Sequence, residues 1–149
     1  MVRKRIALVL SLSTMVMLTG ARSALAQKAN GILCGRYTIG FSASILPSGL
    51  IAGTGAVTSD CRGNLVDGVE TINVDGEVCE GKLSGTYSLT LGGTGTVSFT
   101  LIPRNPTVAC PIVTFTEAIA VGQNGDIVKA VNTTGAEVTI QEEWVRQEQ

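Results

Sequence analysis

Two glutamates occupy positions where an alternating pattern otherwise places apolar residues. Glu117 and Glu142 each fall in phase with apolar neighbours two and four residues away. Successive side chains of a strand point to opposite faces, so each glutamate either lies among apolar side chains or turns to solvent at a bulge or strand end. Burial would raise the pKa of the carboxyl group and make it an acid, a base or a ligand contact. Glu117 is the candidate catalytic residue, whereas Glu143 beside Glu142 favours a solvated strand end. The apolar residues in phase with the two glutamates are Val113, Phe115, Ile119 and Val121, and Val138, Ile140 and Trp144.

The residue types and their spacing argue against nucleophilic catalysis, metal binding and phosphate binding. The chain contains no histidine, which excludes Ser-His-Asp and Cys-His arrangements. No two cysteines have the spacing of a zinc site, and no acidic run has that of a calcium loop. The glycine-rich segments lack the lysine and the helix of a phosphate-binding loop. We therefore expect no metal and no cofactor.

Aromatic side chains are few, and most follow the buried phase. The chain has one tryptophan, two tyrosines and three phenylalanines. Few rings are left exposed to stack on sugars or single-stranded bases, which disfavours a lectin or an oligonucleotide-binding surface. The rings either fill a barrel core, their commoner use, or line a cavity. The candidate ligand-binding residues are Tyr37, Tyr87, Phe99 and Phe115.

The first 26 residues have the pattern of a bacterial signal peptide. Basic residues precede an apolar run over residues 6–18, and Ala24-Leu25-Ala26 supplies the small residues before a cleavage site. The run is shorter than the roughly 20 residues of a membrane span. We expect one domain over residues 27–149, exported to the periplasm or the exterior, with no membrane span after cleavage. All 12 acidic residues but only seven of the 11 basic ones lie in that domain, so its formal net charge is −5, which disfavours nucleic acid as a partner.

Alternation and turn residues predict an all-β fold. Residues 82–101 form a hairpin around Gly92–Gly95, with Tyr87, Leu89 and Leu91 on one face of the first arm and Val97, Phe99 and Leu101 on one face of the second. No segment shows a helical period. About eight antiparallel strands joined by short turns form either a meander closed into a small barrel or a two-sheet sandwich. The other predicted strands cover residues 32–45, 50–59, 65–74, 112–121, 126–131 and 136–145.

The hairpin register also pairs the four cysteines. Folding the first hairpin about Ser48 brings Cys34 beside Cys61, and folding the central hairpin about Gly93 brings Cys79 toward Cys110. An even number of cysteines in an exported protein is typical of disulfides. Each bridge would close a loop of about 30 residues and contribute about 3 kcal/mol to stability.

The order of these signals resembles a loose group of secreted bacterial small β-barrels. The likeness rests on Gly35-x-Tyr37, on residues 60–63, on Gly85-Thr86-Tyr87 and on Gly93-Thr94-Gly95-Thr96. That group is similar in architecture to the calycin-like and allene-oxide-cyclase-like barrels. Plant cyclases of this barrel type act without a cofactor by confining a reactive lipid. No catalytic residue of theirs has a match here, so the resemblance implies the barrel and no activity.

These observations favour an exported, non-enzymatic barrel that binds a small apolar ligand or serves as a structural module of the envelope. The first alternative is a cofactor-free isomerase or cyclase with Glu117 near Tyr37 or Tyr87 inside the barrel. The second is a protein-binding module that uses an exposed sheet edge. The identity of a protein partner stays open.

Overall fold

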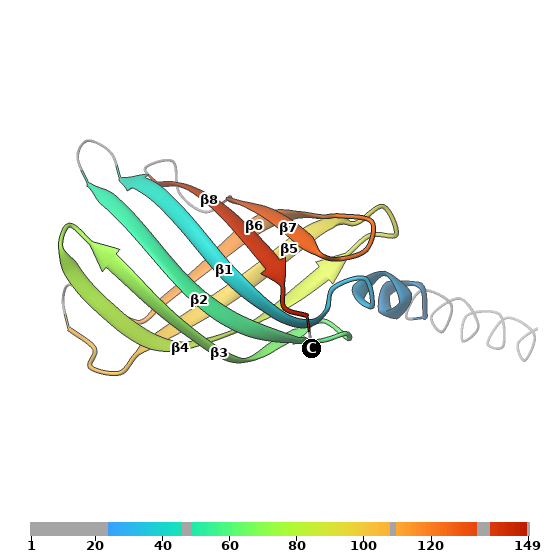
Figure 1. Ribbon diagram of the computed structural model, residues 1–149, viewed down its shortest axis with the longest axis horizontal. Helices are drawn as coiled ribbons and strands as arrows, with labels where there is room; N and C mark the ends of the chain where they lie inside the picture. The colour runs from blue at the N-terminus through green and yellow to red at the C-terminus, as the bar shows by residue number, and fades with distance from the viewer. Residues whose placement is uncertain (1–23, 46–48, 108–109, 134–137, 149) are drawn as a thin grey trace, which may run out of the picture.

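The computed structural model describes residues 24–45, 49–107, 110–133 and 138–148, and its strands form one closed barrel (Figure 1). Each strand pairs antiparallel with the next, and the last returns to pair with the first. The predicted eight-stranded meander barrel is therefore confirmed, and the two-sheet sandwich is not the fold. The strands are β1 (Cys34–Ile45), β2 (Leu50–Asp60), β3 (Asn64–Val74), β4 (Glu77–Leu89), β5 (Thr94–Pro103), β6 (Val113–Val121), β7 (Ile127–Asn132) and β8 (Val138–Arg146).

Closure between β1 and β8 removes the sheet edge that a strand-adding partner would need. The two strands pair in register from Tyr37 opposite Arg146 to Ile45 opposite Val138. Their backbone hydrogen-bonding groups are therefore used within the barrel. The protein-binding alternative required an open sheet, so it falls away for the strands that the structure describes.

Alternation builds the hairpin of β4 and β5 as predicted, with one exception at its turn. Tyr87 and Phe99 are buried on the inward face, and they belong to one core that also contains Trp144. Leu91 was expected on this face but is 58% exposed. The reason is that β4 ends at Leu89, so Leu91 belongs to the turn, where alternation no longer applies.

A bulge in β3 changes which of its residues face inward. Asp67 has a φ of 52°, and the pairing with β4 shifts between Leu65 and Gly68. A Cβ atom on Gly68 would lie 2.3 Å from the backbone oxygen of Leu83, so the two strands approach this closely only because the residue is glycine. The extra residue moves the inward phase from Leu65 to Gly68 and then to Glu70.

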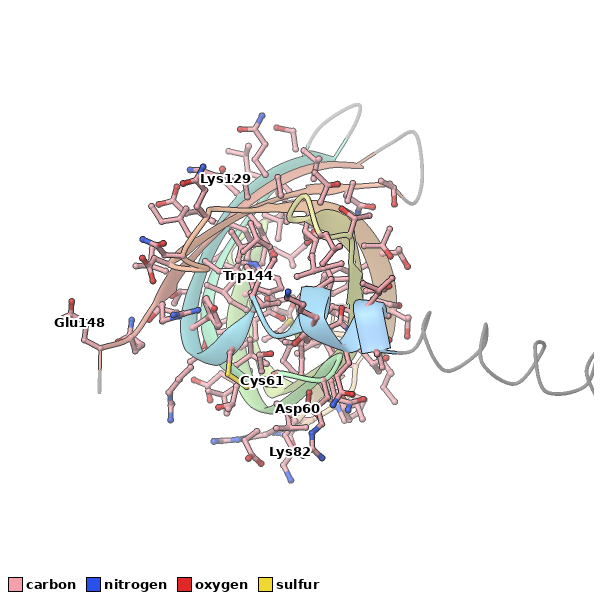
Figure 2. All side chains as sticks on the ribbon, turned by 90° about the vertical axis from the view of Figure 1, so that its right-hand side faces the viewer. Asp60, Cys61, Lys82, Lys129, Trp144 and Glu148 are labelled. Carbon is pink, nitrogen blue, oxygen red and sulfur yellow. A yellow bond between two sulfur atoms is a disulfide. The ribbon has the colours of Figure 1, made fainter. Side chains whose placement is uncertain are left out.

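A short helix, which the alternation did not predict, covers one end of the barrel. Residues 24–30 are helical, and both views place this helix across the barrel opening (Figures 1 and 2). Ala29 and Leu33 insert their apolar side chains into the core. We call this end the helix end. The opposite end, at which β1, β3, β5 and β7 end and β2, β4, β6 and β8 begin, is the loop end.

Asn30 holds the helix in place, and its removal should destabilise the barrel. Its Nδ2 donates to the carbonyl of Arg62 (3.2 Å), and its Oδ1 accepts the amide N–H of Leu89 (2.9 Å). Asn30→Ala leaves these buried backbone groups unpaired, so we expect the free energy of unfolding to fall by about 1–3 kcal/mol. Urea denaturation measures the change, with the exposed Asn105→Ala as the matched control. Equal stability of the two variants would contradict this role of Asn30.

Both cysteine pairs expected from the hairpin register lie at disulfide-bonding distance. The Cα atoms of Cys34 and Cys61 are 4.4 Å apart at the helix end, where Figure 2 labels Cys61. Those of Cys79 and Cys110 are 5.7 Å apart at the loop end, so this bridge ties β4 to the connection that leads into β6. The register differs slightly from the expected one, since Cys34 lies opposite Asp60.

Candidate functional site

Three glutamate side chains point into the barrel from three different strands. We call Glu70 of β3, Glu117 of β6 and Glu142 of β8 the carboxyl cluster; they are 4%, 0% and 5% exposed. Of the two arrangements open for Glu117 and Glu142, the buried one is therefore observed. The interpretation of Glu142 as part of a solvated strand end is wrong, because only its neighbour Glu143 faces outward, where it forms an ion pair with Lys129.

Burial raises the pKa of all three carboxyl groups. It raises the pKa of Glu70 to about 8, with the nearby charge of Glu142 adding to the effect. It raises the pKa of Glu117 to about 9, assisted by the charge and hydrogen bonding of Glu142 and by the charge of Glu70. The pKa of Glu142 is also raised by burial, but hydrogen bonds from Trp144 and Glu117 oppose the shift. Within the pair that it forms with Glu117, Glu142 is therefore the group whose charged form is favoured.

Glu117 and Glu142 form a coupled pair in which Glu117 is the group that holds a proton more firmly. Trp144 donates its Nε1–H to Oε2 of Glu142 at 2.8 Å. Both carboxyl oxygens of Glu117 are buried and, as acceptors, have no donor. A protonated Glu117 instead donates its O–H to Glu142, whose carboxylate then accepts hydrogen bonds from two groups. In this arrangement, with Glu142 ionised and Glu117 protonated, the pair carries a single negative charge.

Toward the loop end, the carboxyl cluster is bordered by apolar side chains that are only half-buried. We call Phe41, Ile72 and Phe115 the apolar collar. Ile72 and Phe115 are the next inward-facing residues beyond the glutamates of β3 and β6, and Phe41 lies opposite the glutamate of β8 in the register. Inward-facing residues nearer the helix end, such as Ile39 and Trp144, are fully buried. Solvent therefore reaches part of these three inward-facing side chains, while Ala43 and Leu101 toward the same end are buried.

Figure 2, which views the barrel from the helix end, shows how the two faces of its wall differ. Trp144 lies inside the ring of strands, whereas Lys82 and Lys129 extend outward from it. Both lysine side chains are exposed. Neither therefore supplies a positive charge to the interior, and the carboxyl groups are left with one another and with Trp144.

The two tyrosines predicted to bind ligand lie at the helix end. The hydroxyl of Tyr37 donates to the carbonyl of Gly125 (2.7 Å) and accepts from the guanidinium of Arg146 (3.1 Å). The hydroxyl of Tyr87 lies 2.8 Å from Oγ of Ser59. Both hydroxyls are thus engaged in closing the barrel, and the structure does not bring either of them to Glu117.

The two phenylalanines predicted to bind ligand lie side by side. The ring centroids of Phe99 and Phe115 are 5.3 Å apart, and the ring of Phe99 also packs edge-on against Trp144 at 5.4 Å. Phe99 is fully buried, whereas Phe115 belongs to the apolar collar. Of the four predicted residues, Phe115 therefore borders the carboxyl cluster directly along its own strand.

Glu70 was not singled out from the sequence, although a signal for it exists. It shares its alternating phase with Ile72 and Val74. The bulge at Asp67 breaks the phase that begins at Leu65, and this break hides the pattern. The position of Phe41 opposite Glu142 follows only from the pairing of β1 with β8.

Two further properties concern the residues that the structure describes. No three of their His, Cys, Asp and Glu side chains are arranged so that they could hold a metal ion. None of their helices has the length and apolar character needed to cross a membrane. The three carboxyl groups of the carboxyl cluster therefore lie in one interior without forming a metal site.

Comparisons with known proteins support the fold. No protein-family model matches the chain, and no curated protein matches it in sequence. A solved structure described as EF1p2_mFAP2b bound to DFHBI is similar, with a TM-score of 0.50 and 14% sequence identity over 82% of this chain and 99% of that one. At this identity the likeness shows a shared fold. The chain is thus an eight-stranded antiparallel β-barrel with the fold of a protein that has been solved with DFHBI bound.

Proposed function

We propose that this chain is an exported, non-enzymatic β-barrel that binds a small apolar ligand at the loop end of its interior. The apolar collar carries this proposal, because Phe41, Ile72 and Phe115 face inward and yet stay half-buried. Covering apolar surface stabilises a protein by about 25 cal/mol per Å², so solvated aromatic side chains inside a barrel favour a ligand that covers them. The mouth of a β-barrel is a common place for such sites.

The similar structure agrees with this proposal. EF1p2_mFAP2b is bound to DFHBI, so a barrel of this fold is able to hold a small molecule. The helix end of the present chain is sealed by Ala29, Leu33 and the bonds of Asn30. A ligand would therefore enter at the loop end. Fold likeness supports the class of function and does not identify the ligand.

Export is supported by the two cysteine pairs at disulfide-bonding distance. Disulfides persist in oxidising compartments, such as the bacterial periplasm or the extracellular space. The predicted signal peptide falls mainly outside the described residues. Cleavage after Ala26 would shorten the helix over residues 24–30 but would leave Ala29 and Asn30, which close the barrel, in the mature chain. The closed eight-stranded architecture also agrees with a place among the calycin-like barrels.

Titration with N-phenyl-1-naphthylamine, an uncharged fluorescent probe, tests ligand binding. We expect its fluorescence to rise on binding to the wild-type protein, and Phe115→Ala to weaken binding about tenfold because a ring of the apolar collar is lost. Leu91→Ala is the control, since this equally apolar side chain is exposed at the turn of the β4–β5 hairpin. The proposal fails if the wild-type protein gives no saturable binding, or if both variants bind as tightly as the wild type.

The protonated Glu117 favours a cofactor-free isomerase as a second candidate. A carboxylic acid with a pKa of about 9 stays neutral at pH 7 and can donate a hydrogen bond to a developing charge. The expected partners Tyr37 and Tyr87 have their hydroxyls bonded at the helix end. Such an enzyme would therefore depend on the carboxyl cluster alone, and turnover abolished by Glu117→Gln would identify it.

A further inference from the structure

The carboxyl cluster has no positively charged partner inside the barrel. Among the described residues, the other inward-facing titratable groups are Tyr37, Tyr87 and Arg146, all at the helix end. Arg146 is bonded there to the hydroxyl of Tyr37 and forms an ion pair with Asp126 at 3.5 Å. Three acidic groups thus share an interior without a cation, although a buried charge is stable only when it is paired.

Glu117 shows most directly that a hydrogen-bond donor is missing. It is fully buried, and neither of its carboxyl oxygens accepts a hydrogen bond from a donor. An unpaired buried acceptor lowers stability by about 1–3 kcal/mol, which an apolar residue of similar size would avoid. The next inward-facing residue of β6, Ile119, is apolar and buried, so an apolar side chain is compatible with this face. The retained carboxyl group therefore indicates a partner that brings donors into the interior.

We propose, building on the proposed function, that the ligand carries a protonated primary amine, which the carboxyl cluster receives while the apolar body of the ligand occupies the apolar collar. An ammonium group has three N–H donors, and the pair Glu117 and Glu142 offers it acceptors from two strands, whereas a metal ion would need at least three ligands around one point. The rings of Phe41 and Phe115 border the same space and attract a cation through their π faces. A metal ion fits less well, because the described acidic groups do not converge on one point.

Binding of the amine would exchange one proton for one cation. Without ligand, Glu117 stays protonated, and its O–H donates a hydrogen bond to the carboxylate of Glu142. When the ammonium group arrives, that proton leaves to solvent, and both carboxylates accept N–H bonds from the ligand. The O–H bond of Glu117 breaks, the proton passes to water or buffer, and the positive charge of the ligand replaces that of the proton, so the net charge of the occupied pair stays the same.

A matched set of probes with one apolar body separates the role of the amine from that of the collar. The probes are 1-naphthylmethylamine, 1-naphthalenemethanol and 1-naphthoate, titrated calorimetrically into the full-length protein at pH 7.5. We expect the amine to bind at least tenfold more tightly than the alcohol and the carboxylate to bind more weakly than both. Amine binding should also release protons, seen as a dependence of the binding heat on the ionisation enthalpy of the buffer.

Two substitutions connect the effect to the cluster. Glu117→Gln and Glu142→Gln should each weaken binding of the amine about tenfold and change binding of the alcohol less than twofold. Glu143→Gln is the matched control, because Glu143 neighbours Glu142 but points outward to Lys129. Glutamine resembles a protonated glutamate, so folding is expected to persist, and circular dichroism checks it. Glu70→Gln provides a third test of the same role.

The outcomes distinguish this inference from the function on which it rests. An alcohol that binds as tightly as the amine overturns the inference and leaves an apolar-ligand barrel. The same follows if the glutamine substitutions at positions 117, 142 and 70 leave amine binding unchanged. Absence of binding for all three probes, together with no binding of N-phenyl-1-naphthylamine, overturns the proposed function itself.

Discussion

Raising the pH from 5 to 8 is expected to lower the free energy of unfolding by several kcal/mol. Glu70 and Glu117 have pKa values of about 8 and about 9 in the folded protein, against 4.5 for an unperturbed glutamate. Between these values the folded state keeps protons that the unfolded state has lost, so each group destabilises the fold by about 1.4 kcal/mol per pH unit. The stability is fully present below about pH 4.5, is lost as the pH rises through this window, and levels off above the folded pKa values. Urea denaturation at half-unit intervals of pH measures it.

Substitution of the two carboxyl groups should flatten this pH profile. The double variant Glu70→Gln/Glu117→Gln no longer titrates at these positions, so its stability should exceed that of the wild type at pH 8 and fall less steeply between pH 5 and 8, with the remaining slope due to Glu142. Glu143→Gln, on the outer face of β8, should keep the wild-type slope. Asp60 acts with the opposite sign, because hydrogen bonds from Asn64 lower its pKa below 3.8, and its effect falls outside the window. A flat wild-type profile would contradict burial of the glutamates.

Much of the fold could be predicted because a barrel wall repeats one simple rule. An inward side chain is apolar and its neighbour is polar, so alternation located β6 within one residue of its observed start at Val113. Turn residues mark the ends of the strands, as at Gly125 between β6 and β7, whose φ of 71° suits a tight turn. The helix over residues 24–30 could not be found in this way, because its helical form depends on packing across the barrel end.

The candidate site could be predicted only in part, because alternation shows which residues share a face and not where that face points. Glu117 and Glu142 were in phase with apolar residues, but burial and solvation were both compatible with that pattern. The pairing of β8 with β1 decides between burial and solvation of these side chains. This pairing joins the first and last strands, which are far apart in the sequence, so local alternation does not reveal it. Glu70 was not predicted to face inward because the bulge at Asp67 interrupts the alternation of β3. The open and sealed ends of the barrel likewise depend on tertiary packing.

Removal of Trp144 is the single side-chain substitution expected to destabilise the barrel most. Its side chain is fully buried, and its ring packs edge-on against Tyr37 (6.2 Å between centroids) and Phe99 (5.4 Å). Trp144→Ala leaves a cavity in the middle of the core, so we expect the free energy of unfolding to fall by about 3–5 kcal/mol. It also leaves Glu142 without the N–H donor that favours its charged form. Far-UV circular dichroism in urea measures the loss, since the variant contains no tryptophan.

Trp144→Phe keeps an aromatic ring but removes the N–H donor together with part of the indole, so its loss of packing is the same at every pH while its loss of the hydrogen bond is not. The loss of that donor raises the pKa of Glu142 further, since the hydrogen bond from Trp144 lowers it. The difference in stability from the wild type should therefore grow by about 1–3 kcal/mol between the pH where Glu142 is protonated and the pH where it is ionised. Phe99→Leu, which alters packing alone, should show a difference from the wild type that stays constant with pH. If Trp144→Phe also showed a constant difference, Trp144 would act only as a core residue, and the Glu117–Glu142 pair would hold its charge without it.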